Sequence, residues 1–429
     1  MEPPLSLLRL LQAGLERRRQ QGQYFSLVPS ASQQGLVDFG SNDTLCLRSN
    51  DSVRKRFLNE LEANPNFPLG AGASRVLGGS DCHVMELERY LADYHGAEDS
   101  LFFNSGYEAN MAIYGSLPQR GDAIVHDEMI HASIRDGIRA GRASIVQSFE
   151  HNDVASLGQL IDNITKSSPA ILGGSQTVFV ALESIYSMEG DTAPVTEMLA
   201  KVKSILPAQN FVFVVDEAHS TGIVGPQGSG YIRHLGLERE AIIQMHSYAK
   251  APGALGAVVI CHPMVKDFLT NYGRNFIYST GPTFPTIATV RACVETLRGE
   301  EGQRLRQQLQ NRVRMFHEFV TRHPHWNAVK RSGVLSIPTL NSKNVDEFHC
   351  PVVPLITSTG LCRSLQEESL QHGFLTHGLH FPVVPRTGER VRLVIHAGNT
   401  TEELHNLVNM LMAWASKKVS AITRRRTSL

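Results

Sequence analysis

The sequence predicts an α/β protein with a mostly parallel central sheet covered by helices, followed by a smaller C-terminal α+β domain. Three observations support this prediction. The chain of 429 residues is too long for one ordinary core. Short apolar segments such as "FVFVV" (211–215) and "AVVI" (257–260) alternate with amphipathic helical segments from about residue 85 onward, as in sheets buried on both faces. From about residue 300 long polar helices separate fewer strands.

The elements can be placed in order along the chain. Residues 1–50 form an arm whose first segment, "LSLLRLLQAGLERRRQQ", is an amphipathic helix that we expect to pack on the body or on a partner. Residues 51–295 form the large domain, in which "HVMELERYLADYHG" is a helix ending at Gly96, with Val84, Leu87 and Leu91 on one face. Residues 296–429 form the small domain, with a helix over 300–323, the strands "CPVVPLIT" and "RVRLVIHAG", and a final helix.

Composition narrows the possible partners and compartments. Forty-one basic residues balance forty-one acidic ones, so we expect no nucleic-acid partner. No apolar segment approaches the roughly 20 residues of a membrane span, and no metal ion is expected. Six scattered cysteines without a CxxC pair or a secretory leader favour reduced thiols in the cytoplasm. The final "TSL" is close to the peroxisomal SKL address but lacks its basic residue, so a peroxisomal location is the weaker alternative.

Polar residues follow four of the predicted strands at the point where each strand ends, in the segments 104–107, 183–187, 216–219 and 247–250. Ligands of open α/β sheets bind beyond the carboxyl ends of the strands, so we expect these segments to form one site. Taken alone, Asp216 is equally compatible with a helix N-cap and with the counter-ion of a protonated ring nitrogen.

Lys250 stands in the otherwise small and apolar segment "HSYAKAPGALGAVVI" (246–260). An amine held among apolar groups has a lowered pKa, which favours the neutral nucleophile that imine formation requires. Ser105 and Gly106 lie where a strand turns into a helix, and free backbone N–H groups there can hold a phosphate. A lysine, an acid and an anion site are what pyridoxal 5'-phosphate needs, and we predict this cofactor.

Several motifs in one order resemble those of the α-oxoamine synthases, the fold-type I pyridoxal-phosphate enzymes that include 8-amino-7-oxononanoate synthase. Among them are "GAGASRVLGG", "FFNSGYEANMA", "ESIYSMEGDTAPV", "DEAHSTGIVGPQGSG" and "HSYAKAPGALGA". The resemblance runs from about residue 35 to residue 415. It implies a homodimer with shared active sites that condenses an amino acid with an acyl thioester, on coenzyme A or a carrier protein, to an α-amino ketone with loss of carbon dioxide.

The resemblance also implies roles for individual residues. Lys250 would form the Schiff base, Asp216 would pair with the pyridinium nitrogen, and His219 would contact the ring hydroxyl. His131 would stack on the face of the ring, and Asn42 would lie near the substrate. The other implied cofactor contacts are Ser105, Gly106, Tyr107, Ser187 and Ser247, with Ser279 and Thr280 reaching the phosphate of the partner subunit.

Two departures from the family leave the substrates open. Where the synthases carry an arginine that binds the amino-acid carboxylate, this chain has His380, which cannot form arginine's bidentate contact. Arg386, Arg390 or Arg392 could replace it, although the last two fit better as braces of the domain. The segment "QGQYFSLVPS" also lacks the arginine that the biotin-pathway enzyme uses for its acyl substrate. Pimeloyl-CoA with alanine and a polyketide-type thioester therefore fit about equally.

Three other classes of protein deserve comparison. An aminotransferase of the same fold would use the same lysine and acid without a thioester. A lysine-less regulatory subunit of the serine palmitoyltransferase type is opposed by the presence of Lys250. A nicotinamide-binding protein is the weakest alternative, because "GAGASR" is not a full GxGxxG motif.

Overall fold

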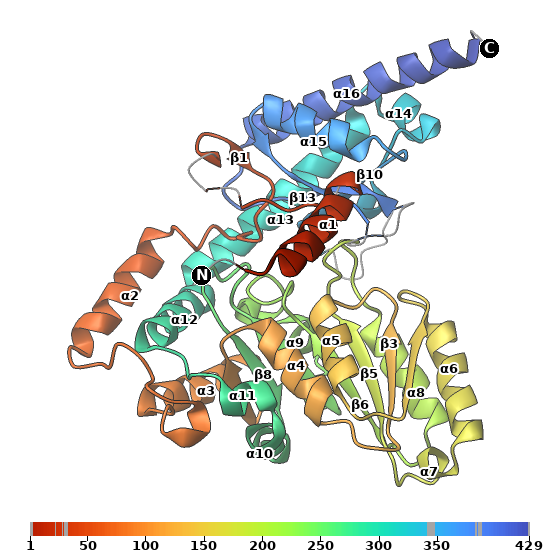
Figure 1. Ribbon diagram of the computed structural model, residues 1–429. Helices are drawn as coiled ribbons and strands as arrows, with labels where there is room; N and C mark the ends of the chain where they lie inside the picture. Colours follow the sequence, from red (N-terminus) through yellow and green to blue (C-terminus); the bar gives the residue numbers. More distant parts are fainter. Residues whose placement is uncertain are drawn as a thin grey trace.

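The computed structural model describes residues 3–21, 23–27, 29, 33–340, 348–381, 384 and 388–427. Arg386, one of the candidate substrate contacts, lies outside the described residues. Figure 1 shows a large α/β domain with a central sheet between helices, and a smaller domain above it. The predicted mostly parallel sheet and the predicted smaller C-terminal α+β domain are both confirmed.

The large domain is organised around a seven-stranded sheet. In spatial order its strands are β2 (Asp99–Phe103), β8 (Ala257–Cys261), β7 (Ile242–Ser247), β6 (Phe211–Asp216), β5 (Val178–Glu183), β3 (Ala123–Asp127) and β4 (Ile145–Phe149). The pairs from β7 to β4 are all parallel, whereas β8 runs antiparallel to both of its neighbours. Residues 248–256, which join β7 to β8, are too few for the crossover of a dozen or more residues that a parallel pair requires.

Helices cover both faces of this sheet, which explains why its strands are apolar throughout. Val180 and Val215 belong to the core on one face, and Phe179 and Val214 to the core on the other. The first face packs against α6 (Val154–Ser167) and α8 (Val195–Ile205), and the second against α4 (Gly106–Ser116) and α5 (Ala132–Ala140). The remaining helices of this domain are α2 (Asp51–Ala63), α3 (Cys82–His95), α7 (Pro169–Leu172), α9 (Tyr231–His234), α10 (Pro263–Tyr272), α11 (Arg274–Tyr278) and α12 (Phe284–Arg298).

Helix α3 begins and ends where the sequence predicts. The side chain of Asp81 caps its first turn by accepting the N–H of Val84. Gly96 ends it in a left-handed conformation at φ 77°, which glycine adopts without steric cost. Val84, Leu87 and Leu91 are all buried, as expected from their spacing.

The small domain contains a four-stranded antiparallel sheet in the order β12 (His377–Leu379), β13 (Arg390–Val394), β10 (Val352–Thr357) and β9 (Leu335–Ser336). Four helices accompany it: α13 (Glu300–Arg322), α14 (Trp326–Ser332), α15 (Cys362–Gln371) and α16 (Thr401–Thr427). Part of the N-terminal arm joins this domain, since β1 (Val37–Asp38) pairs in parallel with β11 (Phe374–Leu375). The arm thereby carries Asn42 into the region between the two domains.

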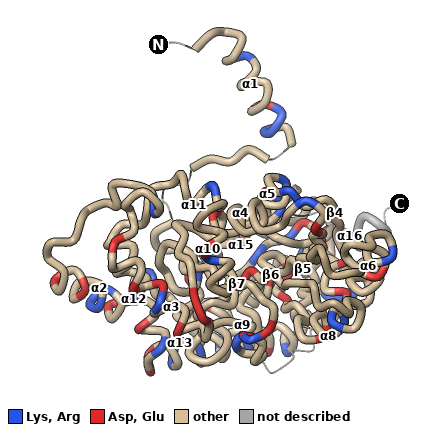
Figure 2. The backbone as a smooth tube through the Cα atoms, turned by 90° about the horizontal axis from the view of Figure 1, so that it is seen from below, with Lys and Arg blue, Asp and Glu red and all other residues tan. Residues whose placement is uncertain are grey.

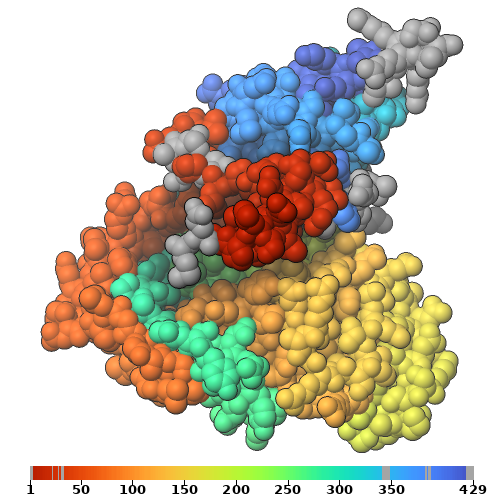
Figure 3. Space-filling view, viewed as in Figure 1, coloured from red at the N-terminus to blue at the C-terminus, as the bar shows by residue number. Residues whose placement is uncertain are grey.

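Helix α1 (Leu5–Gln20) forms as predicted but has no buried residue. In Figure 3 it overlies the junction of the two domains, and the perpendicular view of Figure 2 shows that it stands away from the body. Leu5 and Leu10 are 71% and 69% exposed, so its apolar side chains are not covered by this chain. Among the described helices, none is both long and apolar enough to cross a membrane.

Candidate active site

A pocket at the carboxyl ends of β5, β6 and β7 brings together residues from segments that are far apart in the sequence. Its lining consists of Gly106, Tyr107, Asn110, His131, Ser133, Glu183, Asp216, Ala218, Met245, Ser247 and Lys250. All four strand-end segments singled out in the sequence contribute to it. The expectation that they form one site is therefore met by the geometry.

Lys250 lies in the turn between β7 and β8. Burial lowers the pKa of its amine, the charges of Asp216 and Glu183 oppose this, and the result is a pKa of about 8. A substantial fraction of the amine is therefore neutral in mildly basic solution. This is the protonation state that a nucleophile or a base requires.

Asp216 ends β6 and is held in place by two hydrogen bonds. The backbone N–H of Ala218 donates to Oδ1 (2.9 Å), and Nδ2 of Asn110 donates to Oδ2 (2.8 Å). Nδ2 of Asn110 also donates to Oγ of Ser133 (2.9 Å), which lies 2.7 Å from Nδ1 of His131. A chain of hydrogen bonds thus joins the two predicted ring contacts, Asp216 and His131, through two residues that the sequence analysis missed. Asn110 could have been suspected, because it lies one helical turn after Gly106.

The start of α4 provides a site for an anion. Ser105 is its N-cap, whose hydroxyl accepts the N–H of Glu108 (3.2 Å), so this side chain does not line the pocket. At Gly106 a Cβ would lie 3.3 Å from both Sδ and Cε of Met245, so glycine leaves more space at this corner of the pocket than any larger residue. The N–H groups of the first turn have no partner within the helix, and with the hydroxyl of Ser247 nearby they suit a phosphate.

Glu183 is a second carboxyl group in the pocket that the list of sequence-derived site residues omitted. It ends β5 directly beside Asp216 on β6, and its Oε1 is buried without a hydrogen-bond partner among the described residues. Burial, together with the charge of Asp216, raises its pKa well above the ordinary value. The sequence signal was the same as for Asp216, an acid at the end of an apolar strand. With Lys250, Asp216 and the anion site, this unpartnered oxygen makes the lining fit pyridoxal phosphate.

His219 and Arg392 lie beside the pocket. Burial and the neighbouring charge of Lys250 hold the pKa of His219 well below its ordinary value. Arg392, on β13 of the small domain, donates from Nε to the carbonyl oxygen of Ser187 (2.7 Å) and from Nη2 to Oδ1 of Asn42 (2.9 Å). Its charge acts on Lys250 and on His219. The structure thus gathers the predicted Asn42 and Ser187 around an arginine that the sequence analysis treated as a brace.

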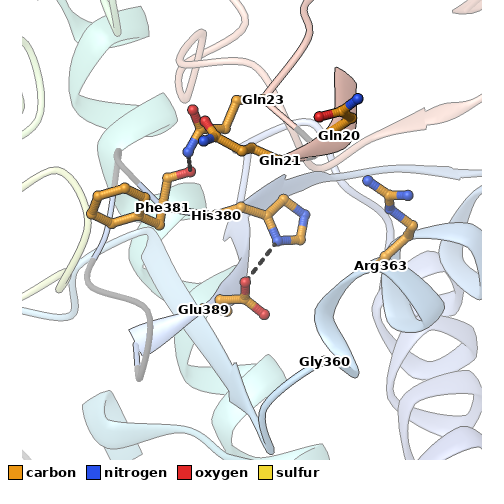
Figure 4. Close-up of a pocket in the computed structure, with 8 residues that line it drawn as sticks. All are labelled: Gln20, Gln21, Gln23, Gly360, Arg363, His380, Phe381 and Glu389. Carbon is orange, nitrogen blue, oxygen red and sulfur yellow. Dashed lines mark hydrogen bonds and ion pairs between the residues drawn. The ribbon is translucent and has the colours of Figure 1, made fainter. Parts of the chain in front are cut away.

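His380 lies in a different cavity, of about 560 Å³, which Figure 4 shows. Its Nδ1 is 3.4 Å from Oε1 of Glu389, and Arg363 projects into the same space. The other residues that line this cavity are Gln20, Gln21, Gln23, Gly360 and Phe381. No residue lines both this cavity and the Lys250 pocket.

Ser279 and Thr280 border a third, small pocket together with residues of β2 and α11, and neither lines the pocket around Lys250. The carbonyl oxygen of Thr280 accepts a hydrogen bond from Asn104 (2.9 Å), and Ser74 and Thr280 form an isolated β-bridge. The side chain of Thr280 remains exposed.

A partly buried ion-pair cluster lies at the carboxyl end of β3, and it predicts a pH-dependent stability. His151 contacts Oδ1 of Asp127 through Nδ1 (2.9 Å) and Oδ2 of Asp191 through Nε2 (3.0 Å). Burial opposes its charge, but the two carboxylates outweigh burial and raise the pKa of His151 to about 10. The imidazolium therefore stabilises the fold fully below the unfolded pKa of about 6.5, and this stabilisation is lost as the pH rises through 10.

We expect the urea midpoint of the wild-type protein to fall between pH 6.5 and pH 10 more steeply than that of the variant His151→Gln, which carries no titrating group at this position. Equilibrium unfolding in a pH series measures both profiles. Parallel profiles would show that the two carboxylates do not retain the proton on His151.

Comparison with known proteins places the chain in a family. The model of aminotransferase class I and II matches residues 34–411. The aminoacyl transferase sphA of Byssochlamys spectabilis is 35% identical over 97% of this chain and 89% of its own length. The 8-amino-7-oxononanoate synthase of Emericella nidulans is 36% identical over 97% of this chain and 98% of its own.

Two solved structures share the fold. Serine palmitoyltransferase from S. paucimobilis is 23% identical with a TM-score of 0.78, covering 98% of this chain and 100% of that one. The 8-amino-7-oxononanoate synthase from Francisella tularensis is 22% identical with a TM-score of 0.68, covering 89% and 98%. The predicted fold, cofactor and family are thereby confirmed. The chain belongs to the aminotransferase class I and II family and, within it, is a pyridoxal-phosphate-dependent α-oxoamine synthase.

Proposed function

We propose that the Lys250 pocket joins the α-carbon of an amino acid to the acyl group of a thioester that carries no second carboxylate. The carbon–sulfur bond of the thioester breaks, the thiol leaves, and the carboxyl group of the amino acid departs as carbon dioxide. One observation carries this proposal. Lys250, Asp216 and the start of α4 meet in one pocket, and the guanidinium of Arg392 acts on the same lysine.

Each pocket residue has a separate role in this proposed reaction. Pyridoxal phosphate, when bound, supplies the electron sink for the carbanion at the α-carbon. Nζ of Lys250, partly neutral near pH 8, accepts the α-proton of the amino acid. The carboxylate of Asp216 would keep a proton on the ring nitrogen of the cofactor, and the amides of Gly106 and Tyr107 would hold the phosphate. The ring of His131, which also lines the pocket, would lie against the cofactor.

Arg392 is the cation best placed for the carboxylate of the amino acid. A guanidinium carries five N–H donors, and the described contacts of Arg392 are one bond from Nε and one from Nη2. Asn42 orients it, so the arginine and the amide can receive one carboxylate together. His380 lies in another cavity and is paired with Glu389, which makes it the weaker candidate.

We propose an uncharged acyl group because the N-terminal segment lacks a cation that could bind a distal carboxylate. No lysine or arginine occurs between residues 20 and 47, the stretch in which the biotin-pathway enzyme binds the distal carboxylate of its substrate. Arg363 is the one permanently charged cation among the described residues that line the His380 cavity. An uncharged acyl chain, on coenzyme A or on a carrier protein, needs no such partner.

The test is a substrate panel with the purified full-length enzyme. Amino acids are combined with octanoyl-CoA and with pimeloyl-CoA, and free thiol and carbon dioxide are both measured. We expect equal amounts of the two products, only when both substrates are present, and faster turnover of the uncharged thioester. Preference for pimeloyl-CoA that disappears in Arg363→Ala would refute the uncharged acyl group. Conversion of an amino acid to a keto acid without thioester would indicate an aminotransferase.

Arg392→Lys is expected to raise the KM for the amino acid by about tenfold to a hundredfold, because charged hydrogen bonds contribute roughly 1.5–3 kcal/mol. Arg390→Lys is the matched control. Arg390 is equally buried on the same strand, but it bonds the carbonyl oxygen of Met188 and the carboxylate of Glu189. Steady-state kinetics measure the KM for the amino acid in both variants. An equal rise of KM in the two variants, or a lowered KM in His380→Arg, would contradict the assignment.

A further inference from the structure

Two histidines are stacked in the core behind the active site. His95 ends α3 and His246 lies on β7, and both are fully buried. Their ring centroids are 3.7 Å apart with an interplanar angle of 28°. Burial lowers the pKa of His95 to about 3 and that of His246 well below its ordinary value. Both rings are therefore neutral, and each can donate one hydrogen bond and accept another.

His95 connects to the turn that carries Lys250. Its Nδ1 lies 2.8 Å from the carbonyl oxygen of Ser229, which can only accept, so the ring proton sits on Nδ1. Nε2 is then an acceptor, and the hydroxyl of Tyr248, 3.0 Å away, donates to it. Tyr248 is fully buried and precedes Lys250 by two residues.

His246 connects to the loop that follows Asp216. Its Nδ1 lies 3.0 Å from Oγ1 of Thr221, whose hydroxyl is also 2.7 Å from the carbonyl oxygen of Glu217. The carboxylate of Glu217 accepts the N–H groups of Tyr231 (2.6 Å) and Ile232 (2.8 Å). The loop after Asp216 is thus bound on one side to the core and on the other to the histidine pair.

We propose that His95 and His246 are positioning residues, which fix the turn bearing Lys250 against the loop that follows Asp216. The two active-site groups come from different connections of the sheet, one after β6 and one after β7. The backbone pairing of Asp216 with Met245 holds the two strands together, and the stacked pair adds a side-chain link from Thr221, after β6, to Tyr248, after β7. The pair touches no lining residue of the pocket with a hydrogen bond, so its contribution is to geometry and not to the reacting atoms.

The experiment compares two buried tyrosines that lie close together. Tyr248→Phe removes the bond to His95, whereas Tyr94→Phe removes from an equally buried tyrosine a bond of the same length, 3.0 Å, to the carbonyl oxygen of Gln227. The full-length holoenzyme is used for each variant. The release rate of the cofactor, the pH midpoint of its visible absorbance and the melting temperature are measured.

We expect both variants to lose similar thermal stability, because each lacks one buried hydrogen bond. Only Tyr248→Phe should also release the cofactor about three- to tenfold faster, the effect of one such bond, and shift the pH midpoint. Thr221→Val, with the buried Thr296→Val as its control, tests the other half of the link in the same way.

Release rates and midpoints that match those of the controls would overturn the positioning role. The inference rests on the proposed role of Lys250 in binding the cofactor, and the wild-type spectrum tests that role separately. Absence of the visible band from the wild-type protein would overturn both. A normal wild-type band with unshifted variants would overturn this inference alone.

Discussion

Lys250→Ala is expected to lower turnover by roughly 10⁴-fold or more. Removing one member of a set of catalytic groups that act as a unit costs about as much as removing them all. In the proposed reaction the amine acts as the nucleophile and base of the pocket, and its pKa of about 8 leaves part of it neutral in mildly basic solution. The variant should also lack the visible absorbance of the lysine-bound cofactor. Stopped-flow turnover and an absorbance spectrum measure the two effects.

Two variants make this test specific. Lys250→Arg keeps a positive charge but cannot form an imine, so it should be as inactive as the alanine variant. Lys266→Ala removes a lysine that is also held between carboxylates, at 3.5 Å from Glu88 and 2.7 Å from Asp99. It should lose stability while keeping the absorbance and the turnover. A yellow, active Lys250→Ala protein would refute the assignment.

Asp216→Asn is expected to lower kcat by about 10²–10³-fold, the usual effect of removing one preorganised electrostatic group. The amide matches the carboxylate in shape but cannot hold a proton on the ring nitrogen of the cofactor. The KM for the amino acid should change little, because Asp216 does not touch the substrate. Turnover and cofactor affinity are measured together.

The control for this variant is Asp122→Asn. Asp122 is also buried and also accepts two hydrogen bonds, in its case both from backbone N–H groups, of Gln119 (2.8 Å) and Thr177 (2.9 Å), but it precedes β3 at the opposite edge of the sheet. Comparable losses of stability with unequal losses of kcat would isolate the electrostatic effect. Equal kcat in the two variants would remove Asp216 from the reaction.

The parts of the site that the sequence predicted are those governed by local rules. Asp216 and Lys250 each follow an apolar strand, and neighbouring parallel strands bring such ends to one edge. Gly106 was recognisable because a strand turns directly into a helix there. The helix α3, with its cap at Asp81 and its stop at Gly96, follows from the same kind of short-range pattern.

The parts that the sequence did not predict depend on contacts between distant segments. The alternation in "RVRLV" shows that Arg390 and Arg392 share a face, but only the packing of the small domain on the large one brings Arg392 to Ser187 and Asn42. His380 lines a cavity with residues of the N-terminal arm and of the small domain, and none of these residues lines the Lys250 pocket. A role assigned from a sequence motif contains no information about how one domain packs on the other.

The pairing of β13 has a consequence for how this family can tolerate insertions and deletions. Five residue pairs join β13 to β10, and three join it to β12. This register fixes Arg390 and Arg392 independently of the number of residues that precede the strand. We therefore expect that residues can be added to or removed from the segment between 380 and 389 with both guanidinium groups kept in place. One residue inserted within 390–394 would instead turn Val391 toward the substrate, because successive strand residues face opposite sides.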